Sequence, residues 1–517
     1  MIEEKLYKKN NHYYEKIGDE IICIDDKIHF DIPESWKFVH LFNIIDSIST
    51  KKYQILQSEI QSTGNIPVIS QSQKYIEGYS NNEEKVLNIN NPIIAFGDHT
   101  KVIKYIDFNF IVGADGLKIL NPILINPKFL FYELEYFKTN MKDRGYSRHF
   151  QFLNKILYPL PPIDEQERIV EKIEGLFTNL DRGVKELGYT LKQVNNYEKS
   201  IISEAIQGKL VPQNSDDEAT SILLEKIRKE REKLIKEKKI KRNKHESVIY
   251  KEDGSYYEKI GKEVKCIDEE IPFEIPESWE WCRLDFIGDW KAGSTPLRNN
   301  TSYYENGTIP WLKTGDLNNG MITKIPEKIT QLALKETSVR LNPIGSVLIA
   351  MYGATIGKLG ILELEATTNQ ACCACILFGN IYNKYLFYYL MSQKEEFIKK
   401  SEGGAQPNIS RMKIINHLFS LPPLKEQKRV IEKIEKELYN IKNMVKTIDE
   451  SLNEAQKLRH SILKKAFEGK LVKQQSDDEP VEKLLERIKV KKTKSKSNKK
   501  NKRIKSKNNK TKQMKLI

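Results

Sequence analysis

The residue clusters that come nearest to a catalytic or metal-binding motif are all incomplete. Cys372, Cys373 and Cys375 lie close together, but no further pair of cysteines or histidines follows at the spacing of zinc ligands. Their surroundings, the apolar run over residues 370–378, predict a buried strand instead. Residues 353–358, Gly-Ala-Thr-Ile-Gly-Lys, have one residue too few for a phosphate-binding loop and lack the Ser or Thr that follows its lysine. We therefore predict that the chain holds no metal ion.

Motifs for methyl transfer and for nucleophilic catalysis are incomplete as well. Asn-Pro dipeptides occur, but none extends to the Asn/Asp-Pro-Pro-aromatic sequence of amino-methyltransferases, and no glycine-rich cofactor loop accompanies them. The 8 histidines are scattered, without the spacing of a nucleophile–base pair. We expect the chain to use no cofactor and to have no catalytic activity of its own.

An internal repeat organises the chain and must position any functional residue. Tyr-Glu-Lys-Ile-Gly, Cys-Ile-Asp and Ile-Pro-Glu-Ser-Trp occur in this order over residues 14–36 and return 243 positions later. A second block, Leu-Pro-Pro-x-x-Glu-Gln-x-Arg followed by Gly-Lys-Leu-Val, begins at Leu160 and returns 261 positions later. The second copy therefore has 18 more residues between the two blocks. Two copies that agree at their ends and differ in between indicate one scaffold that does one job at two places.

Between the repeated blocks, each copy has the pattern of a mixed domain. Short apolar runs broken by Gly, Pro, Asn and Ser, such as residues 91–100 and 345–355, predict strands separated by turns. Residues 127–138 and 383–400 predict helices beside these strands. The apolar runs correspond between the copies, whereas the polar loop residues differ. A rigid scaffold with different polar loops is typical of recognition surfaces.

Each copy closes with a long helix whose apolar residues are spaced alternately by four and three. The two series are Ile173, Phe177, Leu180, Val184, Leu187, Leu191 and Val194, and Ile434, Leu438, Ile441, Val445, Ile448, Leu452 and Ala455. Because a 3.5-residue repeat keeps one side facing a partner helix, we predict a coiled coil in which each helix pairs with its own repeat. The alternative is that the two apolar sides are buried separately against unrelated surfaces. Gly208 and Gly469 fit left-handed C-caps of the helices.

The positive charge is concentrated at the end of the chain. The formal net charge is +14, but residues 491–517 contain 13 Lys and Arg and no acidic residue, so the remainder is close to neutral. This segment has almost no apolar residues and is expected to be a disordered basic tail. No apolar stretch has the length of a signal-peptide core or a membrane span, so we expect a cytoplasmic protein without membrane contact.

The order of the duplicated blocks resembles that of one known family. Ile-Pro-Glu-Ser-Trp, a variable domain, Leu-Pro-Pro-x-x-Glu-Gln-x-Arg, a heptad helix and Gly-Lys-Leu-Val, all given twice, are similar to the specificity (S) subunit of Type I restriction-modification systems. The second variable domain adds Gly-Ser-Thr-Pro at 293–296, Thr-Asn-Gln at 368–370 and residues 403–410, which are similar to recurrent stretches of that family. The first domain lacks the Gly-x-Thr-Pro and Gln-Pro-Asn stretches, so we expect it to belong to a different recognition class.

The resemblance implies an α+β protein with two mixed α/β target-recognition domains, joined by long antiparallel coiled-coil helices and related by a pseudo-twofold internal repeat. The expected boundaries are 1–162 for the first target-recognition domain, 163–247 for a central helical spacer, 248–423 for the second domain, 424–490 for a C-terminal helical spacer and 491–517 for the tail. Each domain would read one half of a bipartite, asymmetric site in double-stranded DNA. The helices would bind two copies of the modification methyltransferase subunit, and restriction (endonuclease/translocase) subunits would join them, so that the complex directs DNA methylation and restriction.

Other classes of function remain open at this point. A coiled-coil adaptor or a stand-alone sequence-specific DNA-binding regulator would also contain long helices, although an adaptor needs no pair of differing, turn-rich domains. A self-sufficient nuclease or methyltransferase would need motifs that this chain lacks.

Polar residues on turns are the first candidates for contacts with bases. Asn and Gln pair with adenine through two hydrogen bonds, and Arg and Lys pair with guanine. The candidates in the first domain are Gln71, Gln73, Asp98, His99, Arg144 and Arg148, and those in the second are Lys313, Tyr352, Asn369, Gln370, Gln406 and Asn408. For each of them the alternative is an exposed side chain, or one that contacts phosphate without sequence preference.

Overall fold

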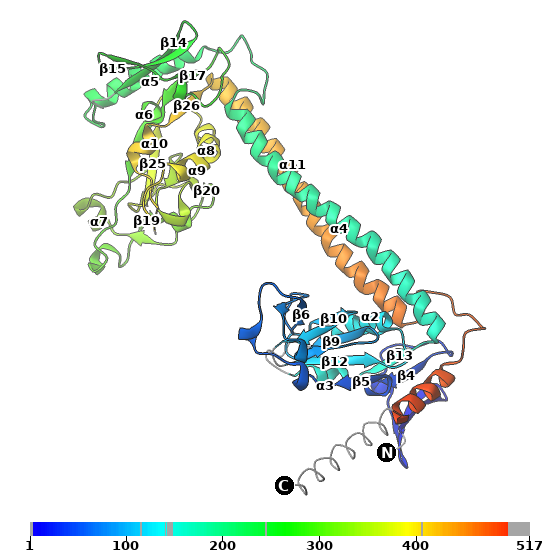
Figure 1. Ribbon diagram of the computed structural model, residues 1–517. Helices are drawn as coiled ribbons and strands as arrows, with labels where there is room; N and C mark the ends of the chain where they lie inside the picture. Colours follow the sequence, from blue (N-terminus) through cyan, green and yellow to red (C-terminus); the bar gives the residue numbers. More distant parts are fainter. Residues whose placement is uncertain are drawn as a thin grey trace. The chain divides into compact units, whose positions relative to one another are not determined.

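The computed structural model describes residues 4–113, 116–139, 141, 148–242, 246–404 and 407–494. The chain divides into two compact units, Met1–Leu187 with Asp449–Ile517, and Gly188–Ile448. The divisions fall within two helices of 44 residues each, α4 (Ile163–Ile206) and α11 (Leu424–Phe467). Each unit therefore combines one mixed domain with a segment of both long helices (Figure 1).

The first unit is built on two four-stranded sheets, ordered β10-β9-β12-β5 and β7-β6-β11-β8. The first sheet contains β5 (Ile45–Ile48), β9 (Ile93–Gly97), β10 (Ile103–Ile106) and β12 (Leu117–Pro122). The second contains β6 (Ile66–Ile69), β7 (Gly78–Ser80), β8 (Val86–Leu87) and β11 (Phe110–Val112). Helix α2 (Pro127–Lys138) packs on β10 and β9, and Asn126 caps it by accepting hydrogen bonds from two backbone N–H groups of its first turn.

Smaller elements of the first unit lie within the repeated blocks or close to them in the sequence. They are β1 (Glu4–Lys9), β2 (His12–Ile17) and β3 (Glu20–Cys23) in one antiparallel sheet, β4 (Lys37–His40) paired with β13 (Leu157–Leu160), and the short helices α1 (Leu41–Ile44) and α3 (Phe150–Leu153).

The second unit has a related arrangement, with one strand more in its first sheet and one strand fewer in its second sheet. Its sheets are ordered β18-β25-β22-β23-β20 and β21-β19-β24. The strands are β18 (Gly288–Ala292), β19 (Ile309–Leu312), β20 (Gly320–Ile322), β21 (Lys328–Ile329), β22 (Val347–Ala350), β23 (Leu359–Leu362), β24 (Thr367–Thr368) and β25 (Cys372–Leu377). The order β23-β22-β25-β18 matches β10-β9-β12-β5, and the parallel pair β19/β24 matches the parallel pair β6/β11. Strand β20 belongs to the longer second copy.

Most of the remaining elements of the second unit again match the first. The remaining elements are β14 (Ser247–Glu252), β15 (Ser255–Ile260) and β16 (Glu263–Cys266) in one sheet, β17 (Glu280–Arg283) paired with β26 (Leu418–Leu421), and the helices α5 (Thr220–Lys236), α6 (Leu284–Ile287), α7 (Gln331–Glu336), α8 (Asn383–Ser392), α9 (Lys394–Lys399) and α10 (Arg411–Ile415). Helices α7 and α9 have no matching helix among the described residues of the first unit.

The central strands are buried on both faces, which explains why their sequences are continuously apolar rather than alternating. All residues of β9 and β22 are buried. Cys372, Cys373 and Cys375 are buried in β25, and burial raises the pKa of each thiol. The sequence prediction of a buried strand at this position is confirmed.

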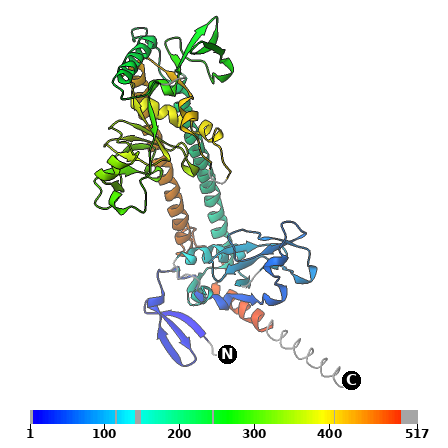
Figure 2. The ribbon, with the colours of Figure 1, turned by 90° about the vertical axis from the view of Figure 1, so that its left-hand side faces the viewer.

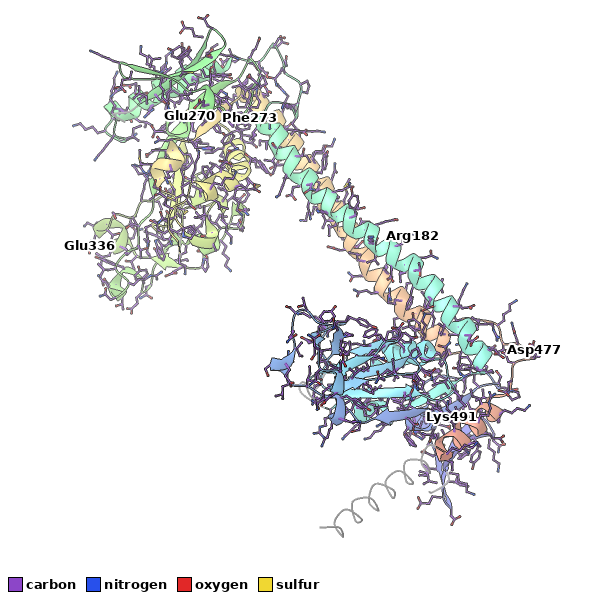
Figure 3. The ribbon with its side chains drawn as sticks, in the orientation of Figure 1. Arg182, Glu270, Phe273, Glu336, Asp477 and Lys491 are labelled. Carbon is purple, nitrogen blue, oxygen red and sulfur yellow. The ribbon has the colours of Figure 1, made fainter. Side chains whose placement is uncertain are left out.

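The two long helices pack on each other in the first unit, as predicted, but the residues of α11 at this contact come after its predicted heptad series in the sequence (Figures 1 and 2). Ile173 and Phe177 of α4 share one apolar core with Leu463 and Phe467 of α11. The Arg459 guanidinium also lies over the Phe177 ring, 4.2 Å from its centroid. Farther along α4 this burial ends: residues 181–186 are exposed, and Figure 3 shows the Arg182 side chain on this stretch. Val184, which the heptad series predicts on the buried side, is exposed here.

Both long helices end as expected at a glycine. Gly208 and Gly469 have φ angles of +71° and +69°. At the end of α11, the backbone N–H of Gly469 donates to Ala466 and that of Lys470 donates to Lys465, which satisfies carbonyl groups of the last turn. A Cβ atom on Gly469 would lie 2.4 Å from Cγ of Pro33, and one on Gly208 would lie 2.4 Å from Cγ of Pro276. The repeated Gly-Lys-Leu-Val and Ile-Pro-Glu-Ser-Trp segments are therefore packing partners.

One boundary differs from the sequence prediction. A helix covers residues 481–494, so the first four residues of the expected basic tail continue this helix instead of being disordered. The apolar residues of the helix, Val481, Leu484 and Ile488, are buried in the first unit's core and stabilise it. The rest of the tail, residues 495–517, lies outside the described residues. Among the helices of the described ranges, none combines the length and apolar character needed to cross a membrane.

Candidate nucleic-acid interface

In the second domain, polar residues follow the ends of two parallel strands. Strands β19 and β24 run side by side in the same direction, so the residues after them, Lys313 and Asn369, lie at the same edge. The backbone N–H of Asn369 donates to the carbonyl oxygen of Leu312 (2.9 Å), which joins the two strand ends. Both side chains are half-buried.

The end of β22 brings three more predicted residues to this edge. The backbone N–H of Met351 donates to Ala371 (2.8 Å), next to Gln370, and Tyr352 forms an isolated β-bridge with Asn408. Gln370 and Asn408 are exposed, and Tyr352 is 44% exposed. Five of the six predicted residues of this domain therefore lie at one edge, and the sixth, Gln406, is outside the described residues. We call this set the second edge: Lys313, Tyr352, Asn369, Gln370 and Asn408.

Two further residues at the second edge had not been selected from the sequence. The hydroxyl group of Thr295 donates to Oε1 of Gln370. Arg298 forms an ion pair with Glu327, whose other carboxylate oxygen lies 2.6 Å from Nζ of Lys313. Thr295 belongs to the Gly-Ser-Thr-Pro motif, and Arg298 follows this motif by two positions. The motif could therefore have identified both residues in the sequence.

The second edge also contains an incompletely satisfied polar atom. Oδ1 of Asn369 is buried and, among the described residues, has no hydrogen-bond partner. A buried acceptor of this kind costs free energy unless a donor reaches it. A donor from a bound ligand is one way to satisfy it.

In the first domain, Gln71 and His99 lie at the edge where β6 and β9 end. The backbone N–H of His99 donates to Oε1 of Gln71 (3.2 Å), and the hydroxyl group of Thr100 donates to the backbone oxygen of Gln71 (2.6 Å). A Cβ atom on Gly116 would lie 2.6 Å from Nε2 of Gln71, so the glycine allows the amide to approach the backbone. We call this set the first edge: Gln71, Gln73, His99 and Arg148.

Asp98 supports the first edge from within. Its side chain is buried, and its Oδ1 atom accepts a hydrogen bond from the backbone N–H of Phe150 (2.9 Å). Its backbone oxygen accepts another from the N–H of His149 (2.9 Å), which places the exposed Arg148 beside it. Its other carboxylate oxygen, Oδ2, lies 3.6 Å from Nζ of Lys118. The structure therefore places the Asp98 side chain beneath the edge surface, whereas the sequence analysis selected it for a contact with a base. Arg144 lies outside the described residues.

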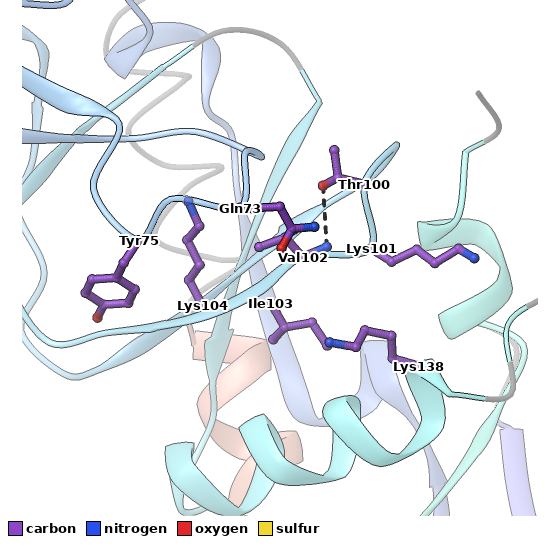
Figure 4. A pocket seen from close by; sticks show the side chains of 8 residues that line it. All are labelled: Gln73, Tyr75, Thr100, Lys101, Val102, Ile103, Lys104 and Lys138. Atoms are coloured by element: carbon purple, nitrogen blue, oxygen red, sulfur yellow. Dashed lines mark hydrogen bonds between the residues drawn. The ribbon is translucent and has the colours of Figure 1, made fainter. Parts of the chain in front are cut away.

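A basic cavity of about 430 Å³ adjoins the first edge (Figure 4). Its lining includes Gln73, Tyr75, Lys101, Lys104 and Lys138. Lys104 is buried and donates to the backbone oxygen of Ser70 (2.8 Å), and its burial lowers the pKa of the ammonium group. Ammonium and amide groups around a polar cavity can donate hydrogen bonds to phosphate oxygens or to acceptor atoms on base edges.

The repeated Leu-Pro-Pro-x-x-Glu-Gln motif joins each domain to the long helices. Oε1 of Gln166 accepts a hydrogen bond from the backbone N–H of Asn126 (2.9 Å), immediately before α2. In the second unit Gln427 accepts one from the N–H of Tyr382 (2.9 Å), immediately before α8. Each glutamine also donates to a proline carbonyl of its own motif, Pro161 or Pro422. The motif was recognised in the sequence, but its partners were not.

The glutamate that precedes this glutamine binds a residue just after the C-terminal end of the other long helix. Glu165 accepts hydrogen bonds from Nε1 of Trp36 (2.9 Å) and from Nε2 of Gln474 (2.9 Å). Glu426 accepts one from Nε2 of Gln213 (2.7 Å). Burial raises the pKa of both glutamates. The two units thus use the same contacts to hold differing polar edges.

The chain thus contains two copies of one mixed domain, each fixed to the long helices through the same motif, and it presents two different polar edges on one repeated scaffold. The chain belongs to the family of the Type I restriction modification DNA specificity domain, whose model matches residues 33–187 and 276–454.

Named relatives cover most of the chain. The specificity subunit of the type I restriction enzyme EcoR124I/EcoR124II from Escherichia coli is 24% identical over 74% of this chain and 82% of its own length. The type I restriction enzyme MjaVIII specificity subunit from Methanocaldococcus jannaschii is 24% identical over 85% of this chain and 94% of its own length. A solved structure that concerns complex assembly and conformational transition of the type I R-M system contains a chain with a similar fold. Its TM-score is 0.56 at 16% identity, and the match covers 85% of this chain and all (100%) of that one.

Proposed function

We propose that this chain is the DNA sequence-recognition subunit of a type I restriction-modification complex, in which the first and second edges each read one half of a bipartite, asymmetric target. The observation that carries the proposal is the same strand order in both units with different polar residues at the corresponding strand ends. A common scaffold gives both domains the same way of approaching a duplex, and differing edge residues give them different base preferences. The relatives described above are all specificity subunits of type I restriction enzymes, which supports the same function.

The partners follow from the same reasoning. Two similar units offer two similar docking surfaces, so we propose that two copies of the modification methyltransferase subunit bind one copy of this chain, and that restriction subunits join this assembly. The chain would direct methylation and restriction without performing either reaction.

Mapping the methylated bases of a host genome with and without this gene tests the proposed function. We expect one bipartite motif to lose its methylation when the gene is deleted, while the methyltransferase gene remains. A mass measurement of the purified complex is expected to give one copy of this chain and two of the methyltransferase. An unchanged methylome would instead favour a coiled-coil adaptor, and a change in transcription alone would favour a DNA-binding regulator.

A further inference from the structure

Arg298 is held against two aromatic rings beside the second edge. Its guanidinium carbon lies 4.5 Å from the ring centroid of Trp311 and 4.8 Å from that of Tyr304. Both rings are fixed in turn: Nε1 of Trp311 donates to the backbone oxygen of Ser294 (3.0 Å), and the Tyr304 hydroxyl donates to that of Pro296 (2.6 Å). Stacking of this kind restricts a guanidinium group to one plane and leaves its N–H groups free to donate within that plane.

A single carboxylate, that of Glu327, fixes Arg298 and Lys313 together. It accepts a hydrogen bond from Nη1 of Arg298, and Nζ of Lys313 lies 2.6 Å from its other oxygen. These hydrogen bonds, the one from Arg298 first, lower the pKa of Glu327, so the carboxylate is ionised at neutral pH. The three side chains together carry one positive charge, and Asp316, whose Oδ2 atom accepts a hydrogen bond from the backbone N–H of Lys313 (2.8 Å), adds a carboxylate beside them.

Arg298 keeps donor groups available for a ligand. Its side chain is 51% exposed. Within the described part of the chain, its hydrogen bond to Glu327 is made by Nη1, and Nη2 and Nε have no hydrogen-bond partner. A planar guanidinium with outward N–H groups matches the O6 and N7 acceptors of guanine in the major groove.

We propose that Arg298 reads a guanine in the half-site of the second domain and that Glu327 is the residue that positions it. This inference rests on the proposed function and adds the base and the residue that recognises it. The first domain has no counterpart, because Ile55 and Val68 stand 243 positions before Arg298 and Trp311. The contact therefore belongs to one half-site only.

Base analogues in the DNA test the proposal without any change in the protein. The complex of this chain with its methyltransferase is bound to its mapped target, in which 7-deazaguanine replaces each guanine of the second half-site in turn. We expect one position to weaken binding by roughly 10- to 100-fold, because the analogue lacks the N7 acceptor. If no position responds, or if the second half-site contains no guanine, the proposal is overturned.

Protein variants identify the residue involved. Arg298→Ala is expected to weaken binding to the natural target to a similar extent and to make it indifferent to 7-deazaguanine at that one position. Arg298→Lys keeps the charge and the aliphatic stem but not the fork, so it should also lose the discrimination, while thermal unfolding reports whether the domain remains folded. Lys335→Ala, which removes an exposed cation from α7, is the matched control and should retain full discrimination.

The variant Glu327→Gln tests whether Glu327 positions the Arg298 guanidinium group or only stabilises the domain. Loss of its negative charge should strengthen binding to unrelated DNA, while the released guanidinium discriminates less at the same guanine. If Arg298→Ala instead weakens binding equally for all sequences and lowers the salt dependence, Arg298 contacts phosphate and the proposal is wrong. A wild-type complex without any half-site preference would refute the proposed function itself, which is a different result from an indifferent Arg298.

Discussion

Gly469 combines two constraints that a side chain would violate at once. Its φ angle is +69°, and a Cβ atom would lie 2.4 Å from Cγ of Pro33. Gly175, within α4, has no atom within 4 Å of the corresponding position. We expect Gly469→Ala to lower the free energy of unfolding by at least about 1 kcal/mol, and Gly175→Ala to raise it by about 0.5–1 kcal/mol because alanine favours helix. Urea unfolding of both variants measures the difference. Equal stability of the two would show that the end of α11 does not depend on this glycine.

Glu133 is a buried carboxyl group of α2 whose burial raises its pKa well above the usual range. The folded state therefore holds this proton at pH values where the unfolded chain has released it, and the stability of the first unit falls as the pH rises above the unfolded pKa of about 4.3. Glu133→Gln removes the titrating group. We expect the difference in unfolding free energy between the variant and the wild type to be small near about pH 5. It should shift in favour of the variant as the pH rises to about 7. Urea midpoints at both pH values test this. Glu135→Gln, which alters a partly exposed ion pair on the same helix, should give a small and similar change at both.

At the scale of single residues, the sequence indicated which turns carry the polar edges but not how each side chain is directed. Lys313 was accessible to prediction because it directly follows an apolar run, and Asn369 because it directly precedes the apolar run over residues 370–378. Asp98 follows such a run as well, yet its carboxylate turns inward, and a strand that is buried on both faces has no alternation from which to predict this. Arg298 and Glu327 are 29 positions apart and meet only in the folded domain.

At the scale of elements, the heptad pattern located both long helices and their pairing. The ends were less accessible: the helix over residues 481–494 exceeds the expected end because lysines can continue a helix that its apolar side already anchors. Near its middle, α4 is exposed over residues 181–186. Residues inserted close to this stretch would therefore disturb few packed side chains.

The helices are expected to set the distance between the two half-sites. Inserting four residues after Leu187, with four more after Ile448 to extend both helices, adds about 6 Å and a rotation of about 40°. DNA rises about 3.4 Å per base pair, so the preferred spacer should grow by one or two base pairs, or activity should be lost if the rotation is not absorbed. A seven-residue insertion at the same points is the control, because it maintains the heptad phase. Methylome sequencing reports the spacer and both half-sites. An active variant with an unchanged spacer would mean that another feature sets this distance.

At the scale of the whole molecule, the chain repeats the scaffold and varies the edges. Glu165, Gln166, Glu426 and Gln427 all belong to the repeated blocks, whereas the second edge lies between these blocks. The two glutamines hold their domains through a backbone N–H group, that of Asn126 or Tyr382, which any replacement residue other than proline would also offer. A domain replaced between Trp279 and Leu421 would therefore meet the same attachment residues as the original.

Replacement of residues 279–421 by the corresponding region of another specificity subunit should change one half of the methylated sequence and leave the other half unchanged. The first edge keeps its own contacts, such as the hydrogen bond from His99 to Gln71, because these lie entirely within the first unit. Exchange of residues 36–160 is the reciprocal control and should change only the other half. Methylome sequencing of both chimaeras in a host that supplies the cognate methyltransferase gives the result. If either exchange alters both halves, the two domains do not read independently, and the sequence preference must then arise from a surface to which both contribute.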